Sequence, residues 1–388
     1  MIERKLAAVL KKSITEYPVV TIFGPRQSGK TTLAKACCPD FNYITLEDKE
    51  TRELALADYK SLFSKYSKPL IIDEIQRVPE IAAAVQVMVD AEREKCGQFV
   101  LTGSQQTGLA ETVDESLAGR TSILELLPLS LDEIGSVAEE LTTDELMLRG
   151  FMPELYRMRK SPTTYYRNYF RTYVERDVRR LVNVKDLLLF ERFVTLLAGR
   201  VGQLVNFSSL SGEVGVSATT LANWFSVLEA SFLIFRLPPY YSNISKRVVK
   251  SPKVYFTEVG LAAYLLGVET PDQLARDPLR GNLFENLVVA DARKNFANCG
   301  REPRMSFYRT EKGFEVDLMF SQGARVRPVE VKSARTFSKY LVRNLSVYSQ
   351  NDPAAADPLL VYDGERIEAF GDASVRADNF RSVKWGLK

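Results

Sequence analysis

The stretch YPVVTIFGPRQSGKTTLAK (residues 17–35) joins an apolar run to a glycine-containing loop and a helix-favouring segment. Residues 17–23 are rich in β-branched side chains, as strands are, and residues 31–35 favour a helix. Between them, GPRQSGKT (residues 24–31) matches the pattern G-x-x-x-x-G-K-[ST] in full, at a strand-to-helix turn. This arrangement predicts a phosphate-binding loop at the start of an α/β domain.

Two further apolar runs extend that domain. They are PLIIDEIQRVP (residues 69–79) and QFVLTGSQQ (residues 98–106), and each is continuous, as expected for a parallel strand buried on both faces. A helical stretch at residues 78–89 lies between them. Strands that alternate with helices predict a parallel sheet in a P-loop NTPase domain, which we place at residues 1–150.

The remainder of the chain divides into two regions. Residues 151–205 have a mostly helical pattern, and residues 206–236 have that of a helix-turn-helix, with Ser217 as the cap of the second helix. We therefore expect a helical middle region at residues 151–250. Residues 281–388 alternate helix and strand signals again, so a separate α/β unit is expected over residues 251–388.

Composition narrows the chemistry. The chain of 388 residues contains no histidine, which excludes histidine-based hydrolysis and leaves carboxylate, lysine, arginine and metal chemistry. Its net charge of +3 says little about partners. Four cysteines without C-x-x-C spacing suit a reducing compartment. With no signal-peptide pattern and no long apolar run, a soluble, cytoplasmic protein is expected, without a membrane partner.

The loop and the strand that ends in LIIDE (residues 70–74) predict a site for ATP and Mg²⁺. Lys30 would reach the β- and γ-phosphates, Thr31 and Asp73 would hold Mg²⁺, and Glu74 would polarise the attacking water. At the end of the next strand, Ser104 or Gln105 would contact the γ-phosphate or its water; a plain polar strand end is the alternative. The residues expected around the nucleotide are Gly24, Pro25, Arg26, Gln27, Ser28, Gly29, Lys30, Thr31, Thr32 and Ser104.

Several motifs together resemble one family. They are GPRQSGKTTL, LIIDEIQRVPE, LTGSQ, LAGR (residues 117–120), LLPLS (residues 126–130) and YVERDV (residues 173–178). The chain resembles prokaryotic ATPases of the AAA+ superfamily whose C-terminal half is a domain of unknown function. The resemblance implies a nucleotide-driven machine with a winged-helix module in the middle and a restriction-endonuclease-like fold at the C-terminus.

The same resemblance bears on two single residues. It makes Arg120, in LAGR, the candidate for an arginine that completes the γ-phosphate site, supplied by a neighbouring subunit of a homo-oligomer; a surface or ion-paired arginine is the alternative. In YFTEVGL (residues 255–261) Glu258 stands where the family pattern leads us to expect aspartate, which leaves the role of this carboxylate open.

A second candidate site lies in FEVDLMFSQGARVRPVEVKSA (residues 314–334). Glu330 and Lys332 are two apart in a predicted strand and share a face, and Asp317 would come from the neighbouring strand of a hairpin. With Glu285 from a preceding helix, the set resembles the E…D…E-x-K core of restriction-like nucleases. Glu285, Asp317 and Glu330 would bind Mg²⁺ or Mn²⁺, with Glu315 as an outer ligand and Lys332 acting on water. The alternative is a salt-bridge network that binds nothing.

Two basic segments predict contact with DNA. Residues 156–180 contain seven Arg and one Lys against two acidic residues, interleaved with tyrosines, and residues 245–253 contain Lys246, Arg247, Lys250 and Lys253. The second helix of the helix-turn-helix, residues 217–231, has no Lys or Arg and is a poor major-groove reader. Two functions remain open: an ATPase coupled to DNA handling, with a nuclease site, or a nucleotide-switched module that docks DNA or protein.

Overall fold

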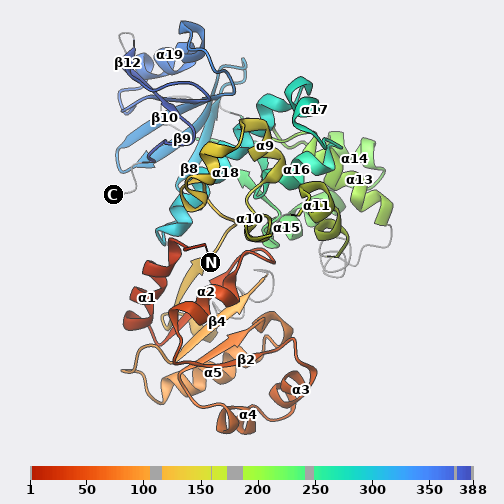
Figure 1. Ribbon diagram of the computed structural model, residues 1–388, viewed down its shortest axis with the longest axis vertical. Coiled ribbons are helices and arrows are strands. Elements are labelled where there is room, and N and C mark those ends of the chain that lie inside the picture. The colour runs from red at the N-terminus through yellow and green to blue at the C-terminus, as the bar shows by residue number, and fades with distance from the viewer. Residues whose placement is uncertain are drawn as a thin grey trace.

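The computed structural model describes residues 2–104, 116–158, 160–172, 187–240, 249–370 and 374–385. Figure 1 shows a sheet with its helices formed by the N-terminal part of the chain, a second sheet formed by the C-terminal part at the opposite end, and a group of helices beside them. Residues 105–115, 173–186 and 241–248 lie outside the description, and so do Gln105, the YVERDV motif and the basic residues Lys246 and Arg247.

The N-terminal sheet has five parallel strands in the order β2-β3-β4-β1-β5. Its helices and strands follow one another along the chain as α1 (Leu6–Glu16), β1 (Val19–Phe23), α2 (Lys30–Cys37), β2 (Asn42–Thr45), α3 (Lys49–Ala57), α4 (Tyr59–Lys65), β3 (Leu70–Asp73), α5 (Ile81–Asp90), β4 (Phe99–Gly103) and β5 (Thr121–Glu125). The strand β1 lies between β4 and β5. The loop that follows β1 therefore lies at the carboxyl ends of the strands, between these two neighbours.

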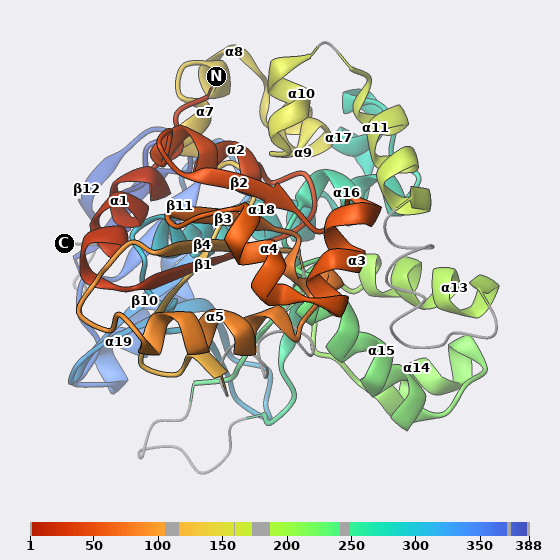
Figure 2. The same cartoon turned by 90° about the horizontal axis from the view of Figure 1, so that it is seen from below.

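This sheet is the centre of three layers. Figure 2 shows α1 and α2 on one side of it and α5 on the other. Successive strand residues divide between the two sides: Val20 and Ile22 pack with α1 and α2, whereas Val19 and Phe23 pack in the cluster that includes α4 and α5. Both faces are therefore dry, which explains why β1, β3 and β4 are continuous apolar runs.

The chain then forms a helical region. Its elements are α7 (Leu131–Ile134), α8 (Val137–Glu140), α9 (Thr143–Arg149), α10 (Pro153–Arg157), α11 (Pro162–Tyr169), α13 (Leu187–Ala198), α14 (Phe207–Val214), α15 (Ala218–Ala230), β6 (Ile234–Leu237), β7 (Lys253–Phe256), α16 (Val259–Leu265), α17 (Pro271–Arg276) and α18 (Arg280–Asn298). Pro162 begins α11, where its missing N–H costs nothing.

The predicted helix-turn-helix is present as α14 and α15. Gly215 ends α14 with φ +90°, a left-handed conformation that glycine adopts without a steric cost, and the Ser217 side chain caps α15. The apolar residues Leu221, Phe225 and Leu228 are buried. A two-stranded antiparallel sheet, β6 with β7, follows this pair of helices.

The C-terminal sheet is mixed, with the order β12-β13-β11-β10-β9-β8. Its elements are β8 (Met305–Arg309), β9 (Glu315–Gln322), β10 (Arg325–Lys332), α19 (Arg343–Asn351), β11 (Leu359–Tyr362), β12 (Ile367–Phe370) and β13 (Val375–Asn379). Alternate residues face opposite sides, so Leu318 packs in the cluster that contains α18 and Met319 in the cluster that contains α19. The predicted hairpin is β9 paired with β10.

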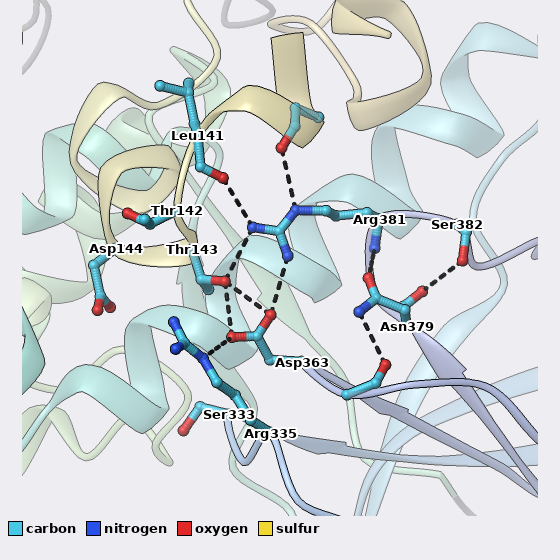
Figure 3. Close-up of polar contacts among 12 residues, drawn as sticks. Leu141, Thr142, Thr143, Asp144, Ser333, Arg335, Asp363, Asn379, Arg381 and Ser382 are labelled. Carbon is cyan, nitrogen blue, oxygen red and sulfur yellow. Dashed lines mark hydrogen bonds and ion pairs between the residues drawn. The ribbon is translucent and has the colours of Figure 1, made fainter. Parts of the chain in front are cut away.

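One polar cluster fastens the helical region to this sheet (Figure 3). The Arg381 guanidinium donates to the carbonyls of Ala138 and Leu141, at 3.1 Å each, and to the Asp363 carboxylate at 3.0 Å. The Thr143 hydroxyl donates to the same carboxylate at 2.8 Å. Because the Asp363 side chain is only 4% exposed, these bonds are shielded from water, and the start of α9 is firmly attached to the end of β11.

The α/β class and the parallel N-terminal sheet are confirmed. The predicted boundaries at residues 150 and 250 stay predictions, and one apolar cluster, from Leu129 to Trp385, crosses both positions. The predicted helix at residues 78–89 corresponds to α5, which begins three residues later. Within the described residues, no helix combines the length and apolarity needed to cross a bilayer.

Candidate functional site

The loop between β1 and α2 has the shape of a phosphate cradle. Gly24 lies against the residue that follows β5, so closely that a Cβ atom on Gly24 would be 2.1 Å from the carbonyl oxygen of Leu126. Gly29 has φ +95°. Only glycine satisfies both requirements without strain. The loop leads directly into α2, so the N-terminus of that helix points at the cradle and favours an anion.

Lys30 is buried at this helix start. Its ammonium group donates to the carbonyls of Gly24 and Pro25, at 2.9 Å each, and the side chain reaches the loop interior. Burial lowers the pKa of Lys30 to about 8, although the carboxylates of Glu74 and Asp73 act to raise it. A buried cation whose bonds go to carbonyls is short of negative charge, which an anionic ligand would supply.

Asp73 ends β3 and gathers three hydroxyl donors. Thr31 Oγ1 donates to its carboxylate at 2.9 Å, Tyr43 donates from the neighbouring strand at 3.0 Å, and Thr102 donates from the strand on the other side. The sequence predicted that Thr31 and Asp73 lie together, and the structure brings them into contact. In P-loop proteins, a hydroxyl at the end of the loop and an aspartate at the end of a strand are the residue types that hold Mg²⁺.

Glu74 follows in a left-handed backbone conformation, with φ +58°. Its carboxylate accepts hydrogen bonds from the Gln76 side chain and, at 3.3 Å, from the Ser104 hydroxyl. Gln76 also donates to Ser104 at 2.8 Å. An uncommon φ at a polar residue marks a position that its surroundings hold in place. The carboxylate is therefore held by Gln76 and Ser104, near enough to Lys30 for its charge to act on the pKa of that lysine.

Arg4 supports the loop from outside. Its guanidinium donates to the carbonyls of Ser28 and Leu127, at 2.7 Å each, and pairs with Glu133 at 3.0 Å. The Ser28 hydroxyl is buried and has no hydrogen-bond partner among the described residues, so it is free to meet a ligand. Lys30 lacks an anionic partner and the Ser28 hydroxyl lacks a hydrogen-bond partner among the described residues, and both of these groups fit a phosphate ligand.

The other predicted contacts of the loop differ in exposure. Arg26 is half-buried, whereas Gln27 and Thr32 are exposed. Ser104 is fully buried and belongs to the group around Glu74, so it is more than a polar strand end.

Arg120 lies away from this group. Its backbone carbonyl accepts from the N–H of Val19, at the beginning of β1, whereas the phosphate loop follows the end of β1. Arg120 therefore lies at the amino ends of the parallel strands, whereas the phosphate loop of its own chain lies at their carboxyl ends. Its guanidinium pairs with Asp90 at 2.7 and 2.9 Å, as the ion-paired alternative expects.

The carboxylates of the C-terminal candidate site fall into two groups, each around a lysine. In the first, Lys253 Nζ lies 3.0 Å from Glu285 and 2.6 Å from Glu315. Tyr255 donates to Glu285 at 2.6 Å, and Arg309 pairs with the other oxygen of Glu315 at 2.9 Å. Lys253 was predicted as a DNA contact, and this prediction is wrong: its side chain is 1% exposed, because it points from β7 into the acidic cluster.

The second group surrounds Lys332. Its ammonium lies 3.0 Å from Asp317 and 2.7 Å from Glu330, and Asp317 also accepts from the backbone N–H of Val331 at 2.9 Å. The charges of Lys332 and Lys253 outweigh the effect of burial and lower the pKa of Asp317. Burial, and then the charge of Asp317, raises the pKa of Glu330 to about 8. Glu330 therefore takes up a proton more readily than an exposed glutamate does.

Across both groups, four carboxylates face three cations, namely Lys253, Lys332 and Arg309. A proton on Glu330 would balance the remaining negative charge, and the oxygen of Glu330 that does not contact Lys332 is buried without a hydrogen-bond partner among the described residues. In the described part of the chain, no three Asp, Glu or Cys side chains are placed to hold a metal ion. Glu285, Asp317 and Glu330 thus do not form a three-carboxylate metal site in this arrangement.

Glu258 binds backbone N–H groups of two separate segments. Its carboxylate caps α16 by accepting from the N–H of Gly260 at 3.2 Å, and it also accepts from the N–H of Phe151 at 2.9 Å. Burial raises the pKa of Glu258, and the charge of Lys294 opposes that shift. A shorter aspartate would have to reach both N–H groups from one methylene further away, so glutamate at this position has a local reason.

The basic segments are only partly described. In the first, Arg157, Lys160, Arg167 and Arg171 are exposed, and Lys160 pairs with Glu154. In the second, Lys250 is exposed. The prediction that these segments contact DNA stays a prediction.

Some residues of the site could not be found from the motifs. Tyr43, Thr102, Gln76 and Arg4 all hold groups of the phosphate site, and none belongs to the loop pattern. Gln76 had a weak signal, because it lies two residues after Glu74 in DEIQ. Arg4 had none, since it precedes the loop by some twenty residues.

A parallel sheet of order 2-3-4-1-5, a glycine-bounded loop after the first strand and an acidic pair after the third strand together define a P-loop protein with an AAA domain. Family models agree: an AAA domain matches residues 16–135, and two domains of unknown function, DUF8612 and DUF4143, match residues 140–272 and 280–380. The chain belongs to the family of AAA-domain proteins that carry these two C-terminal domains, which confirms the resemblance found in the sequence.

Two relatives bear the name of uncharacterized proteins. The chain is 31% identical over 379 residues to the uncharacterized protein Rv2008c of Mycobacterium tuberculosis, an alignment that covers 97% of this chain and 83% of the relative. An uncharacterized protein of Haemophilus influenzae is 25% identical over 323 residues, with 74% and 77% covered.

Two solved structures are weakly similar. The Walker-type ATPase of Pyrococcus abyssi is 15% identical, with a TM-score of 0.39 and coverage of 68% of this chain and 96% of that chain. The RuvB Holliday junction branch migration motor of Thermotoga maritima is 18% identical, with a TM-score of 0.33 and coverage of 61% and 90%. No functional inference follows from either.

Proposed function

We propose that the AAA domain binds and hydrolyses ATP. The observation that carries this proposal is the contact of Thr31 with Asp73 beside a glycine-bounded loop in which Lys30 is buried and short of negative charge. Phosphate would meet Lys30 and the N–H groups at the start of α2. Thr31 and Asp73 would hold Mg²⁺, which neutralises charge on the phosphate oxygens when bound.

Glu74 is the proposed base that orients the attacking water. Its carboxylate is held by Gln76 and Ser104, so it is kept in one position while the water loses its proton. Ser104 belongs to the same group and supports Glu74 from the end of β4.

Arg120 is proposed to serve the site of a second copy of the chain. It cannot reach the loop of its own chain, because it lies at the amino ends of the strands and the loop lies at their carboxyl ends. The pair with Asp90 would have to open, and this competing partner is what a neighbouring γ-phosphate would replace.

We infer that the C-terminal carboxylates form an ion-pair network. The support is that Lys253, Lys332 and Arg309 occupy the space between them and that a proton on Glu330 completes the neutrality. The residues do not fit a three-carboxylate metal site as they are arranged, so we derive no nuclease step from them. The C-terminal domain is then a docking module.

DNA is the second candidate partner. It is favoured by one observation, the helix-turn-helix of α14 and α15 followed by the antiparallel pair of β6 and β7. Because α15 lacks Lys and Arg, phosphate contacts would come from the basic segments at residues 156–180 and 245–253. Coupling of ATP hydrolysis to DNA handling rests on this second proposal.

Two variants test the ATPase proposal. Lys30→Ala should abolish ATP binding, whereas Glu74→Gln should keep ATP bound and reduce phosphate release at least a hundredfold, because only Glu74 acts on water. Filter binding and phosphate release measure the two effects. Glu80→Gln removes an exposed carboxylate nearby and should change neither. Normal hydrolysis by the Glu74 variant would refute the assignment of the base.

A further inference from the structure

One contact on the phosphate loop comes from outside the AAA domain. The Tyr165 hydroxyl, on α11, donates to the side-chain oxygen of Gln27 at 2.6 Å. The two residues are 138 positions apart, and Gln27 is the fourth residue of GPRQSGKT. The helical region therefore touches the loop that would hold the phosphates.

Gln27 is a sensitive point of that loop. Its backbone has φ +63°, a left-handed conformation that a residue with a Cβ atom adopts only at a cost of about 1 kcal/mol or more. The neighbouring Ser28 carbonyl is held by Arg4. The loop is thus held in position from two sides, by Arg4 and by Tyr165.

The surroundings of Tyr165 fix the direction of its hydroxyl and keep this hydroxyl protonated. Its side chain is 6% exposed, its ring stacks on Tyr169 and meets Tyr166 edge to face, and both contacts fix the direction of the hydroxyl. Burial, with further contributions from the charges of Glu258 and Glu154, raises the pKa of Tyr165. The phenol keeps its proton and donates it to Gln27 throughout the physiological range.

The next residue connects α11 to the rest of the helical region. The Tyr166 hydroxyl donates to the carbonyl of Arg149, the last residue of α9, at 2.9 Å. Its ring lies against Gly260 so closely that a Cβ atom there would be 2.5 Å from it. Adjacent tyrosines thus bind opposite neighbours, the phosphate loop on one side and α9 and α16 on the other.

The far end of α9 is the part fastened to the C-terminal sheet. Thr143, its first residue, donates to Asp363, which also pairs with Arg381 (Figure 3). A helix of only seven residues therefore has one end on α11 and the other on the C-terminal domain. These hydrogen bonds connect α11 to the C-terminal sheet through α9.

We propose that Tyr165 is a positioning residue of the nucleotide site, and that its bond to Gln27 couples occupancy of the phosphate loop to the position of α11 and α9. The inference rests on the proposed ATP binding and adds a regulatory path to it. When the loop adjusts to phosphate, the Gln27 side chain moves with it and α11 follows. Since such coupling is reciprocal, a partner that shifts α11 would change the affinity for ATP by the same factor.

The test is a double-mutant cycle on the full chain. Tyr165→Phe and Gln27→Ala should each weaken ATP binding about three- to tenfold, the worth of one hydrogen bond, and the double variant should be no weaker than the weaker single variant. Thr164→Ala is the matched control, because it removes an exposed hydroxyl from α11 and leaves the bonds of Tyr165 and Tyr166 in place. It should bind ATP as the wild type does.

A second measurement separates positioning from packing. Hydrogen exchange at the amides of residues 163–169 should slow on addition of ATP in the wild type, and this change should be lost in Tyr165→Phe and in Gln27→Ala. Gln27 is exposed, so its variant provides the answer even if the Tyr165 variant is unstable. Multiplicative losses of affinity in the double variant, or the same exchange response in all proteins, would overturn the inference while ATP hydrolysis stands. Absence of ATP binding by the wild type would overturn both proposals.

Discussion

The phosphate loop and the C-terminal carboxylate cluster both bury charge, but with opposite imbalance. In the loop, burial lowers the pKa of Lys30 to about 8, because the ammonium is bonded to carbonyls and lacks an anion. In the cluster, burial and then the charge of Asp317 raise the pKa of Glu330 to about 8, and the carboxylates outnumber the cations by one. An anionic ligand would supply the negative charge that Lys30 lacks, whereas a proton on Glu330 would balance the excess negative charge of the cluster.

The comparison shows how to tell a binding site from a structural network of the same residue types. In the loop, Ser28 and Lys30 present groups whose needs the protein does not meet. In the cluster, the lysines fill the place that a metal ion would take between the carboxylates. Residue types alone do not distinguish the two; the partners of each charge do.

The largest effect that sharpens this comparison is expected from Lys253→Ala. Removal of one member of a buried ion pair leaves uncompensated carboxylates, which costs about 3 to 5 kcal/mol. Urea unfolding should show the loss, and DNA or nucleotide affinity of the folded fraction should be unchanged. Lys250→Ala, at an exposed position three residues earlier, is the control and should be neutral. A neutral Lys253→Ala would mean that the cluster is not held by this lysine.

A smaller effect with a defined pH dependence is expected from Glu330→Gln. Because the pKa of Glu330 is raised to about 8 in the folded protein, its contribution to stability is present below the unfolded value and is lost as the pH rises through about 8. Glutamine imitates the protonated carboxyl at every pH. The variant should therefore nearly match the wild type at pH 5 and exceed it by several kcal/mol at pH 8.5, at about 1.4 kcal/mol for each unit of the pKa shift.

Urea unfolding at several pH values measures this difference. Glu368→Gln, on an exposed residue of β12, should follow the wild type throughout. If Glu330→Gln were instead less stable than the wild type at pH 6.5, the carboxylate would be ionised well below pH 8, and the negative excess would need a cation.

The smallest effect concerns the surface. Replacement of Lys246, Arg247 and Lys250 by Gln should reduce the slope of log affinity for DNA against log salt by about three if each neutralises one phosphate. Lys253 is excluded from this set because it is buried. An unaltered slope would move the contact to the arginines of residues 156–180.

The local parts of this account could be predicted from the sequence. The loop, the acidic pair Asp73 and Glu74 and the helix-turn-helix each depend on residues close together in the chain, and their spacing is informative. The α/β class followed from apolar runs that alternate with helical stretches.

The remainder depends on contacts between distant segments. Lys253 was assigned to a basic surface because its neighbours in the chain are basic, but Glu285, its partner, lies 32 residues away. Tyr165 gave no sign of its bond to Gln27, since a tyrosine in a helix usually serves packing. Likewise, Arg120 could be placed at the wrong edge of the sheet for its own loop only once the register of β5 beside β1 was known.

The most direct test is a count of bound Mn²⁺ by electron paramagnetic resonance, with and without a non-hydrolysable ATP analogue. We expect one Mn²⁺ per chain with the nucleotide and none without it. This ion should be lost in Lys30→Ala, which cannot retain the nucleotide, and kept in Asp317→Asn. Mn²⁺ bound without nucleotide, retained in Lys30→Ala and lost in Asp317→Asn, would contradict the account and place a metal site in the C-terminal cluster.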